Sequence, residues 1–280
     1  QLGAAGPQGA GPATGREGGM SPGTVEVLTG VASPPEGVSR TVRVWTPQGY
    51  GQDPARRYPV LYMHDGQTAF AHPTSSQFDT WCANVVVQGL IDQQTIEPWI
   101  IVAVDHTGQR PAEYGDWEPG GRAIRYAEFL VDTLKPWVDA TYATRPEPWW
   151  TAVMGSSLGG LCSLHLGRSW PDVFGRSGAL SPSTMWDRGA LFARWERHTR
   201  HWTRIYLDAG EHEEVVNGGV PVDYGAAARN FYFHLRALDY APHEVALVLE
   251  PGGAHHETDW CRRLPAALTW LLSSSGEPTP

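Results

Sequence analysis

The segment Val-Met-Gly-Ser-Ser-Leu-Gly-Gly-Leu at residues 153–161 carries the strongest structural signal in this chain. The pattern Gly-x-Ser-x-Gly fits it in one register only, with Gly155, Ser157 and Gly159 at the defining positions. Centring the pattern on Ser156 would require glycine at two positions that hold Met and Leu. Ser157 is therefore the candidate nucleophile, and Ser156 is a spacer.

The residues on either side make this motif informative. The pattern alone is weak in a chain that contains 32 glycines. Here an apolar run at 150–154 leads into the motif and a helical pattern at 158–169 leads out of it. Strand, sharp turn and helix in this order are the setting of a nucleophile elbow, where the glycines prevent collisions across the turn. Free N–H groups at the start of the helix would favour an oxyanion beside the serine. The alternative is a glycine-rich turn without chemistry.

Short runs rich in β-branched and aromatic residues alternate with helical patterns along the chain. We predict strands at 24–28, 40–46, 59–63, 99–104, 150–154, 176–180, 204–208 and 244–249. We predict helices at 122–135, 158–169, 223–238 and 258–272, with Pro136 breaking or kinking the first of them. The central strands are almost continuously apolar, as parallel strands covered on both faces are. The pattern predicts an α/β fold with a mostly parallel central sheet, helices on both faces and the first two strands as an antiparallel edge.

Length and composition limit the organisation of the chain and its partners. The 280 residues suffice for one large α/β domain or at most two small ones. Residues 1–22 are mainly Gly, Ala and Pro and predict a disordered tail, whereas 23–280 show neither a repeat nor a linker and predict a single domain. A net charge of −9 argues against a nucleic-acid partner and an anionic membrane surface. No apolar run is long enough to span a bilayer.

Three cysteines and the first residue say little about the compartment. The cysteines are few and widely spaced, so they do not form a disulfide framework, although the sequence does not decide whether two of them form a single disulfide. The chain begins with Gln and shows no signal-peptide segment, which fits both a cytoplasmic protein and a mature secreted one. The sequence leaves the compartment and the oligomeric state open.

A serine hydroxyl is a poor nucleophile unless a base removes its proton. In a fold of this kind the acid and then the histidine follow the serine along the chain. Four carboxylates lie at or just after the strand predicted at 204–208, namely Asp208, Glu211, Glu213 and Glu214. Asp208 is expected within the strand end, and the residues themselves do not choose among the other three. A metal site at 211–213 is an alternative that lacks a distant set of ligands.

Candidates for the base and for the oxyanion site follow two other strands. The strand at 244–249 leads into a glycine-rich loop with His255 and His256, which are adjacent and so do not both point into one site. The strand at 59–63 leads into a turn where the peptide between Gly66 and Gln67 can present its N–H group, since glycine tolerates unusual backbone angles. An ordinary strand-ending turn is the alternative.

Five segments together resemble the esterase-D-like family of α/β-hydrolases. They are VLYMHDGQTAF (60–70), RPAEY (110–114), YAEFLVDTLKPWVDATY (126–142), MGSSLGGL (154–161) and HHETDWCRRLPAAL (255–268). The similarity spans most of residues 40–272, in order. The family includes feruloyl, acetyl-xylan and enterochelin esterases, S-formylglutathione hydrolases and mycolyltransferases. The resemblance implies an α/β-hydrolase with a Ser–His–acid triad and neither a metal nor an organic cofactor.

The resemblance also assigns the triad. It implies Ser157 as the nucleophile, and an acid three residues after Gly210, which is Glu213. Asp is frequent at that position in the family, so Glu is a departure and Glu214 stays open. The family pattern His-Asn-Glu-x-x-Trp matches residues 255–260 and selects His255 over its neighbour.

The resemblance further implies that the backbone N–H groups of Gln67 and Leu158 bind the oxyanion. Asp65 would shape the turn that carries Gln67. Arg110 and Glu113 would form a structural ion pair near the site.

These residues predict a serine carboxylic-ester hydrolase that works through an acyl-enzyme and accepts small acyl or aryl esters. The loops at 66–82, 106–121, 183–200 and 211–223 decide the substrate and carry Phe70, Phe78, Trp81, Tyr114, Trp117, Trp186 and Trp195. Aromatic side chains suit an aryl or sugar-linked acyl group, unless they pack the loops together. The alternatives are an acyltransferase with the same triad and a non-catalytic binding protein. The natural ester stays open.

Overall fold

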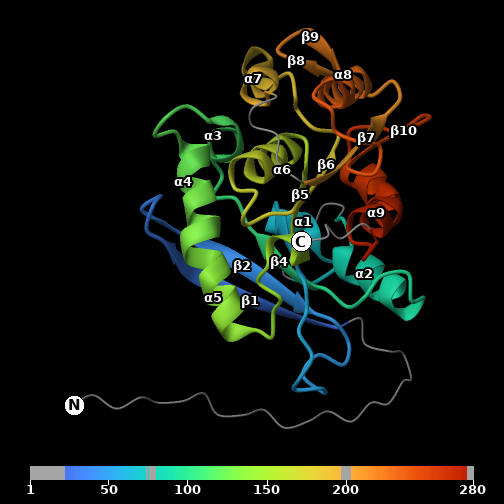
Figure 1. Ribbon diagram of the computed structural model, residues 1–280. Coiled ribbons are helices and arrows are strands. Elements are labelled where there is room, and N and C mark those ends of the chain that lie inside the picture. Colours follow the sequence, from blue (N-terminus) through green and yellow to red (C-terminus); the bar gives the residue numbers. More distant parts are fainter. Residues whose placement is uncertain (1–22, 74, 76–79, 197–202, 276–280) are drawn as a thin grey trace.

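An eight-stranded sheet organises the chain in a computed structural model that describes residues 23–73, 75, 80–196 and 203–275 (Figure 1). Its strands lie in the order β1-β2-β4-β3-β5-β6-β7-β10. They are β1 (Thr24–Ser33), β2 (Val38–Thr46), β3 (Val60–His64), β4 (Ile100–Val104), β5 (Thr151–Ser156), β6 (Arg176–Leu180), β7 (Arg204–Gly210) and β10 (Val245–Glu250). The strands β8 (Glu214–Asn217) and β9 (Val220–Asp223) form a separate antiparallel hairpin.

The directions of the strands confirm the predicted sheet. β1 pairs with β2 and β2 with β4 in antiparallel fashion, and every pair from β4 to β10 is parallel. The eight predicted strands all occur. The hairpin of β8 and β9 escaped prediction because its strands are four residues long and mostly exposed. The tail predicted at 1–22 lies outside the described residues.

Helices cover both faces of the sheet. They are α1 (Gly66–Ala69), α2 (Ala83–Asp92), α3 (Arg110–Gly115), α4 (Arg122–Glu128), α5 (Lys135–Thr141), α6 (Leu158–Ser169), α7 (Trp186–Arg194), α8 (Tyr224–Ala237) and α9 (Glu257–Leu271). A π-helical turn η1 (Phe129–Leu134) joins α4 to α5, and a 3₁₀ turn η2 (Pro148–Trp150) precedes β5. The four predicted helices are present, while α1, α2, α3 and α7 were missed.

The helix expected to end near Pro136 continues through it to Thr141. Pro136 lies in the first turn of α5, directly after the π-helical turn. Proline inside a continuous helix removes one backbone hydrogen bond and crowds the preceding turn, and the π-helical turn directly before Pro136 is a local distortion at the point where this happens. Of the two predicted effects of Pro136, a break does not occur, and the helix is instead locally distorted by the π-turn.

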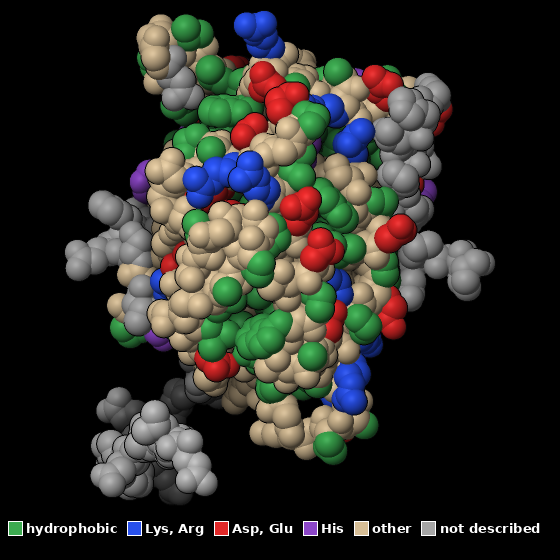
Figure 2. Space-filling view, turned by 90° about the vertical axis from the view of Figure 1, so that its left-hand side faces the viewer, with side chains coloured by type: hydrophobic (Ala, Val, Ile, Leu, Met, Phe, Trp, Pro, Cys, Tyr) green, Lys and Arg blue, Asp and Glu red, His purple; other side chains and the backbone are tan. Residues whose placement is uncertain are grey.

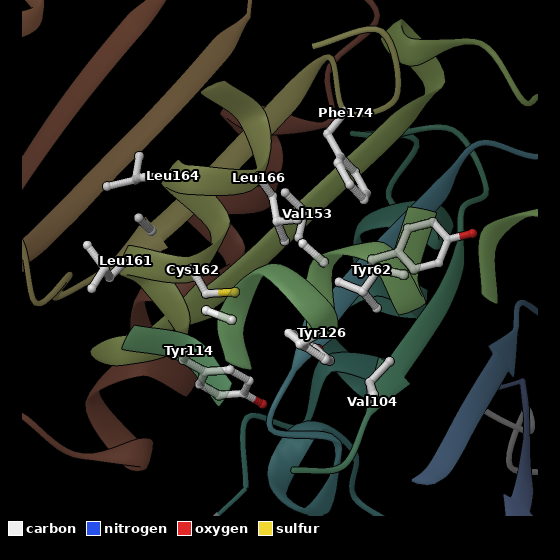
Figure 3. Packing of buried hydrophobic residues seen from close by; sticks show 14 of the residues in the cluster. Tyr62, Val104, Tyr114, Tyr126, Val153, Leu161, Cys162, Leu164, Leu166 and Phe174 are labelled. Carbon is white, nitrogen blue, oxygen red and sulfur yellow. The ribbon is translucent and has the colours of Figure 1, made fainter. Parts of the chain in front are cut away.

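Alternate side chains of the central strands enter two separate cores. Val60 and Tyr62 of β3 belong to the cluster beneath α4, α5, α6 and α8, and Leu61 and Met63 belong to the cluster beneath α2 and α9. Figure 3 shows part of the first cluster, with side chains of α6 beside those of β3, β4 and β5. Because both faces are covered, these strands need apolar residues at every position, which explains the continuous runs in the sequence.

The surface carries charges of both signs. Figure 2 views the molecule from the side of α4 and α5, where acidic and basic side chains are interspersed among apolar and polar ones. Within the described ranges, no helix has the length and apolar character needed to cross a membrane.

A substitution in the second core tests this layering. Ile101 of β4 is fully buried in the cluster beneath α2 and α9, so Ile101→Ala should lower the free energy of unfolding by about 2–5 kcal/mol through lost burial and a cavity. Val85→Ala on the exposed side of α2 is the matched control and should change it by less than about 0.5 kcal/mol. Urea unfolding measures both, and equal values for the two variants would contradict the arrangement.

Candidate active site

Ser157 occupies a strained turn between β5 and α6. Its backbone angles are φ 56° and ψ −121°, a region that residues other than glycine rarely adopt. A Cβ atom added at Gly155 would lie 2.6 Å from the carbonyl carbon of Gly159, so the turn closes only because Gly155 has no side chain. The strand, turn and helix thus form the sharp elbow that the motif predicts.

The loop after β10 brings His255 to this serine. Nε2 of His255 lies 3.0 Å from Oγ of Ser157. The Ala254 N–H donates to Oδ1 of Asp259 at 3.0 Å, which fixes the loop against the start of α9. His256 instead caps the N-terminus of α9, accepts from the Thr258 N–H and is exposed. Of the two adjacent histidines, His255 is the one that contacts the serine.

Glu213 contacts the other ring nitrogen of His255. Its Oε1 lies 2.5 Å from Nδ1 of His255, and its Oε2 accepts from the Gly210 N–H at 2.6 Å and from the Ser181 hydroxyl at 2.9 Å. Burial alone would raise the pKa of Glu213, but these hydrogen bonds hold that pKa below its ordinary value. Glu214 is exposed at the start of β8. Among the acids considered, the contact with His255 belongs to Glu213.

These contacts fix the protons of the imidazole ring. An ionised carboxylate only accepts hydrogen bonds, so Nδ1 of His255 carries the proton that Glu213 accepts. Nε2 of the neutral ring is then an acceptor, and the Ser157 hydroxyl donates to it. The arrangement can take a proton from the serine and give it to a leaving group.

A second set of polar side chains holds Glu213 in place. The Ser181 oxygen accepts from Nε1 of Trp260 at 3.0 Å and from Nη2 of Arg263 at 2.8 Å while its hydroxyl donates to Glu213. We did not predict Ser181 or Arg263. Ser181 follows β6 without a motif, but Arg263 falls within the family-like segment at 255–268 and could have been found from it.

The backbone N–H groups of Gln67 and Leu158, the expected oxyanion donors, both lie in the first turns of helices. Gln67 is in the first turn of α1, and Leu158 is the first residue of α6. N–H groups in a first turn have no partner within the helix and remain available. The Gln67 side chain donates to the carbonyl of His106 at 2.8 Å and accepts from its N–H at 3.2 Å, which orients this turn. Asp65 caps it in the left-handed conformation, with φ 56°.

The expected ion pair between Arg110 and Glu113 does not form. Arg110 binds the Asp65 carboxylate with Nε at 2.7 Å and Nη2 at 2.9 Å, and Nη2 also donates to the carbonyl of Ser156 at 3.1 Å. Glu113 is buried on the inner side of α3 and pairs with Arg40 of β2 at 3.0 Å. The two residues are neighbours on one helix, but their charges face different parts of the molecule.

The cleft extends to both sides of Ser157 and His255. One cavity of about 360 Å³ is lined by Asp65, Gln67, Thr68, Trp81, His106, Arg110, Ser156, Ser157, His255, Glu257 and Trp260. The other, of about 510 Å³, is lined by Ser157, Leu158, Ser183, Met185, Trp186, Asp187, Val215, Val222, Tyr224 and His255. The first is rich in charged and polar groups, and the second is mainly apolar.

The loop aromatics divide between the cleft and the core. Trp81 and Trp186 line the cleft. Packing within the protein accounts for four others, which are the buried residues Phe70, Tyr114, Trp117 and Trp195. Phe78 lies outside the described residues. We did not predict Tyr224 as part of the site, although its ring centroid is 4.0 Å from that of His255. Within the described ranges, no group of three His, Cys, Asp or Glu side chains could hold a metal ion.

Comparison with known proteins assigns the chain to a family. The family model described as "Putative esterase" matches residues 33–271, which is most of the chain. The chain therefore belongs to this esterase family, and the suspected resemblance is confirmed. It is a carboxylic ester hydrolase that acts on small-molecule esters, which sets aside the non-catalytic alternative.

Individual relatives are distant. The uncharacterized protein YbbA of Bacillus subtilis is 20% identical over 247 residues, which cover 85% of this chain and 94% of that protein. The enterobactin esterase FES of Shigella flexneri, solved in the presence of enterobactin, aligns with a TM-score of 0.70 and 21% identity. That alignment covers 89% of this chain and 58% of the FES chain. The ferulic acid esterase AmCE1/Fae1A of Anaeromyces mucronatus, solved with ferulic acid, aligns with a TM-score of 0.68 and 18% identity, covering 91% and 93%. These structures confirm the α/β-hydrolase fold.

Gly155→Ala tests the steric requirement of the elbow. The added Cβ would collide with backbone atoms of Gly159, so the turn must shift and move Ser157 out of line with His255. A displacement near 1 Å costs roughly 10²-fold in rate, and we expect a loss of that size in kcat for p-nitrophenyl acetate.

Gly89→Ala is the control for this substitution. A Cβ at Gly89 of α2 meets nothing within 4 Å, and alanine favours a helix, so kcat should stay unchanged and Tm should not fall. A Gly155→Ala variant with the kcat of the control would contradict the steric account.

Proposed function

We propose that this chain of the esterase family hydrolyses its ester through Ser157, His255 and Glu213, with a covalent acyl-enzyme intermediate. The observation that carries the proposal is one unbroken line of contacts. It runs from Oγ of Ser157 to Nε2 of His255 at 3.0 Å and from Nδ1 of His255 to Glu213 at 2.5 Å. This is the constellation in which a base activates a serine and a buried carboxylate orients the base.

In the first half of the reaction, His255 takes the proton of Ser157 as Oγ attacks the ester carbonyl. The imidazolium that forms lies against Glu213, which the Gly210 N–H and the Ser181 hydroxyl keep ionised. When the tetrahedral intermediate collapses, His255 returns the proton to the leaving alcohol. Glu213 keeps its negative charge throughout.

The N–H groups of Gln67 and Leu158 stabilise the oxyanion of the tetrahedral intermediate. Both belong to the first turns of helices, where the N–H groups lack intrahelical partners, and the dipole of the twelve-residue α6 further favours negative charge at Leu158. The loss of one such donor typically costs about 10²–10³ in rate. Two donors from different loops can hold a tetrahedral oxyanion only while the spacing of these loops is fixed. The contacts of Arg110 with Asp65 and with the Ser156 carbonyl connect the two loops.

In the second half of the reaction, a water molecule enters in place of the alcohol. His255 takes a proton from this water, which attacks the acyl carbonyl, and the same N–H groups hold the second oxyanion. Ser157 then leaves with the proton from His255, and the carboxylic acid is released. No step requires a metal ion or an organic cofactor.

We further propose that the substrates are small acyl or aryl esters. The cavities on the two sides of Ser157, of about 360 and 510 Å³, can receive the two parts of such an ester, and the exposed ring of Trp186 can stack on an aromatic group. The ferulic acid and enterobactin esterases that share this fold support an aryl group. The eight-stranded sheet, built from strands between residues 24 and 250, supports our prediction that residues 23–280 form one domain.

Variants of the proposed triad test this mechanism. Hydrolysis of p-nitrophenyl acetate, butyrate and octanoate and of methyl ferulate should fall roughly 10⁴- to 10⁶-fold in kcat for Ser157→Ala and His255→Ala. Glu213→Gln, which no longer compensates the imidazolium charge, should lose about 10³- to 10⁴-fold.

The neighbouring residues supply matched controls. His256→Ala and Glu214→Gln change the same residue types one position away, at exposed side chains, and should each retain kcat within about threefold. If Ser157→Ala keeps its activity, the proposed nucleophile is wrong. If Glu214→Gln loses more activity than Glu213→Gln, the assignment of the acid is wrong.

A further inference from the structure

A second carboxyl group lies behind Glu213, and the proposed mechanism does not use it. The side chain of Asp208, near the end of β7, is fully buried. Within the described residues, neither of its oxygens has a hydrogen-bond partner of ordinary geometry. Burial raises the pKa of Asp208 to about 7; Arg263 opposes this shift, the neighbouring charge of Glu213 adds to it, and the Ser181 N–H and the Tyr206 hydroxyl also oppose it. Burying a carboxyl group that lacks short hydrogen bonds lowers the stability of the folded chain, so its presence calls for an explanation.

Arg263 lies between the two carboxylates. Its Nε is 3.4 Å from Oδ1 of Asp208, and its Nη1 is 3.4 Å from Oε2 of Glu213. Both distances exceed the 2.7–2.9 Å or so of a closed pair between opposite charges. The short bond of the guanidinium, at 2.8 Å, is the one from Nη2 to the Ser181 oxygen. The positive charge of Arg263 is therefore shared between Asp208 and Glu213.

The other groups around Asp208 come from the strands and the helix that pack against it. Tyr206 lies two residues earlier on the same face of β7, and burial raises its pKa, so it stays neutral. Glu250 at the end of β10 lies 3.9 Å from Nη1 of Arg263 and is held mainly by the exposed Arg262 at 2.8 Å. The neighbouring strand β6 contributes the uncharged Ser181, whose N–H donates to the backbone carbonyl of Asp208. Arg263 is the cation that faces both carboxylates from α9.

We propose that Asp208 is a proton-exchanging carboxyl that acts through Arg263 as a positioning residue for Glu213. When Asp208 is protonated it is neutral, and the positive charge of Arg263 then acts on Glu213 alone. When Asp208 loses its proton to solvent, its carboxylate competes with Glu213 for the positive charge of Arg263. The charge of Glu213 is then less neutralised and interacts more strongly with His255. The transition state carries an imidazolium, so this added negative charge lowers its free energy and raises the rate. The inference rests on the proposed function of Glu213 and His255.

Loss of the Asp208 proton, which raises the rate, lowers the free energy of unfolding. A carboxyl whose pKa is about 7 in the folded chain, against about 3.9 unfolded, binds more protons when folded between these pH values. Stability then falls as pH rises through this range, because the folded protein must either keep a proton or bury a charge. Asn at position 208 has the shape of the protonated acid and does not titrate. It should therefore escape this loss.

The test compares Asp208→Asn with the full-length wild type between pH 5.5 and 8.5. With p-nitrophenyl butyrate, the ratio of kcat/KM for wild type to that for the variant should be close to one at pH 5.5. It should rise to about three- to tenfold at pH 8.5, the size expected for one charge at this range in a protein. Over the same interval, the Tm of the variant should increase relative to that of wild type. A merely structural residue would move activity and stability in the same direction.

The controls separate this inference from the proposed function. Asp172→Asn, at an exposed position after α6, should show neither trend. A wild-type to Asp208→Asn ratio that is constant across pH would overturn the inference, even if Ser157→Ala is inactive. Activity in Ser157→Ala would instead overturn the proposed function. Should Asp208→Asn fail to fold, carboxyl titration of wild type labelled with ¹³C-aspartate decides the matter. An aspartate that titrates near pH 7 supports the inference, and none above pH 6 overturns it.

Discussion

The turn at Ser157 is the constraint on which the site depends. A residue with a side chain is held at φ 56°, and this is possible because Gly155 and Gly159 leave room for the chain to reverse. The strain places Oγ beyond the end of the sheet and makes Leu158 the first residue of α6, so its N–H is free. A well-packed surrounding structure has to maintain such strain. Here β5 lies in the middle of the sheet, with α6 fully buried along most of its length.

The other site residues reach this turn because parallel strands end at the same edge of the sheet. Glu213 follows β7 and His255 follows β10, and these two strands are paired with Gly210 opposite Glu250. The turn with Gln67 follows β3, which pairs with β5 on its other side. Each functional group thus sits on a short loop whose two ends are fixed by strand or helix. Behind the loops, Ser181, Trp260 and Arg263 connect the acid to α9, so the orientation of the imidazole depends on the packing of that helix.

The sequence predicted the sheet and the residues that meet at its edge, because both leave strong local patterns. Buried parallel strands are apolar at every position, and the glycines around Ser157 are required by sterics. The choice of Glu213 over Glu214 was different. It depended on the family pattern, since both are glutamates in one loop and only the fold buries the first and exposes the second. Long-range contacts left no local signal. The pairing of Arg110 with Asp65 and of Glu113 with Arg40 is decided by the packing of α3, and the expected pair within that helix was wrong.

The proposed mechanism requires Ser157 to become acylated during turnover. A fluorophosphonate reacts with an activated serine to give a stable phosphonyl ester, which intact mass and peptide mapping can place on a single residue. We expect one adduct per chain, on Oγ of Ser157, with loss of ester hydrolysis in proportion to labelling. An adduct on Ser156 or on Ser183, whose hydroxyl lies 3.3 Å from that of Ser157, would contradict it. Continued hydrolysis by a fully labelled protein would contradict it equally.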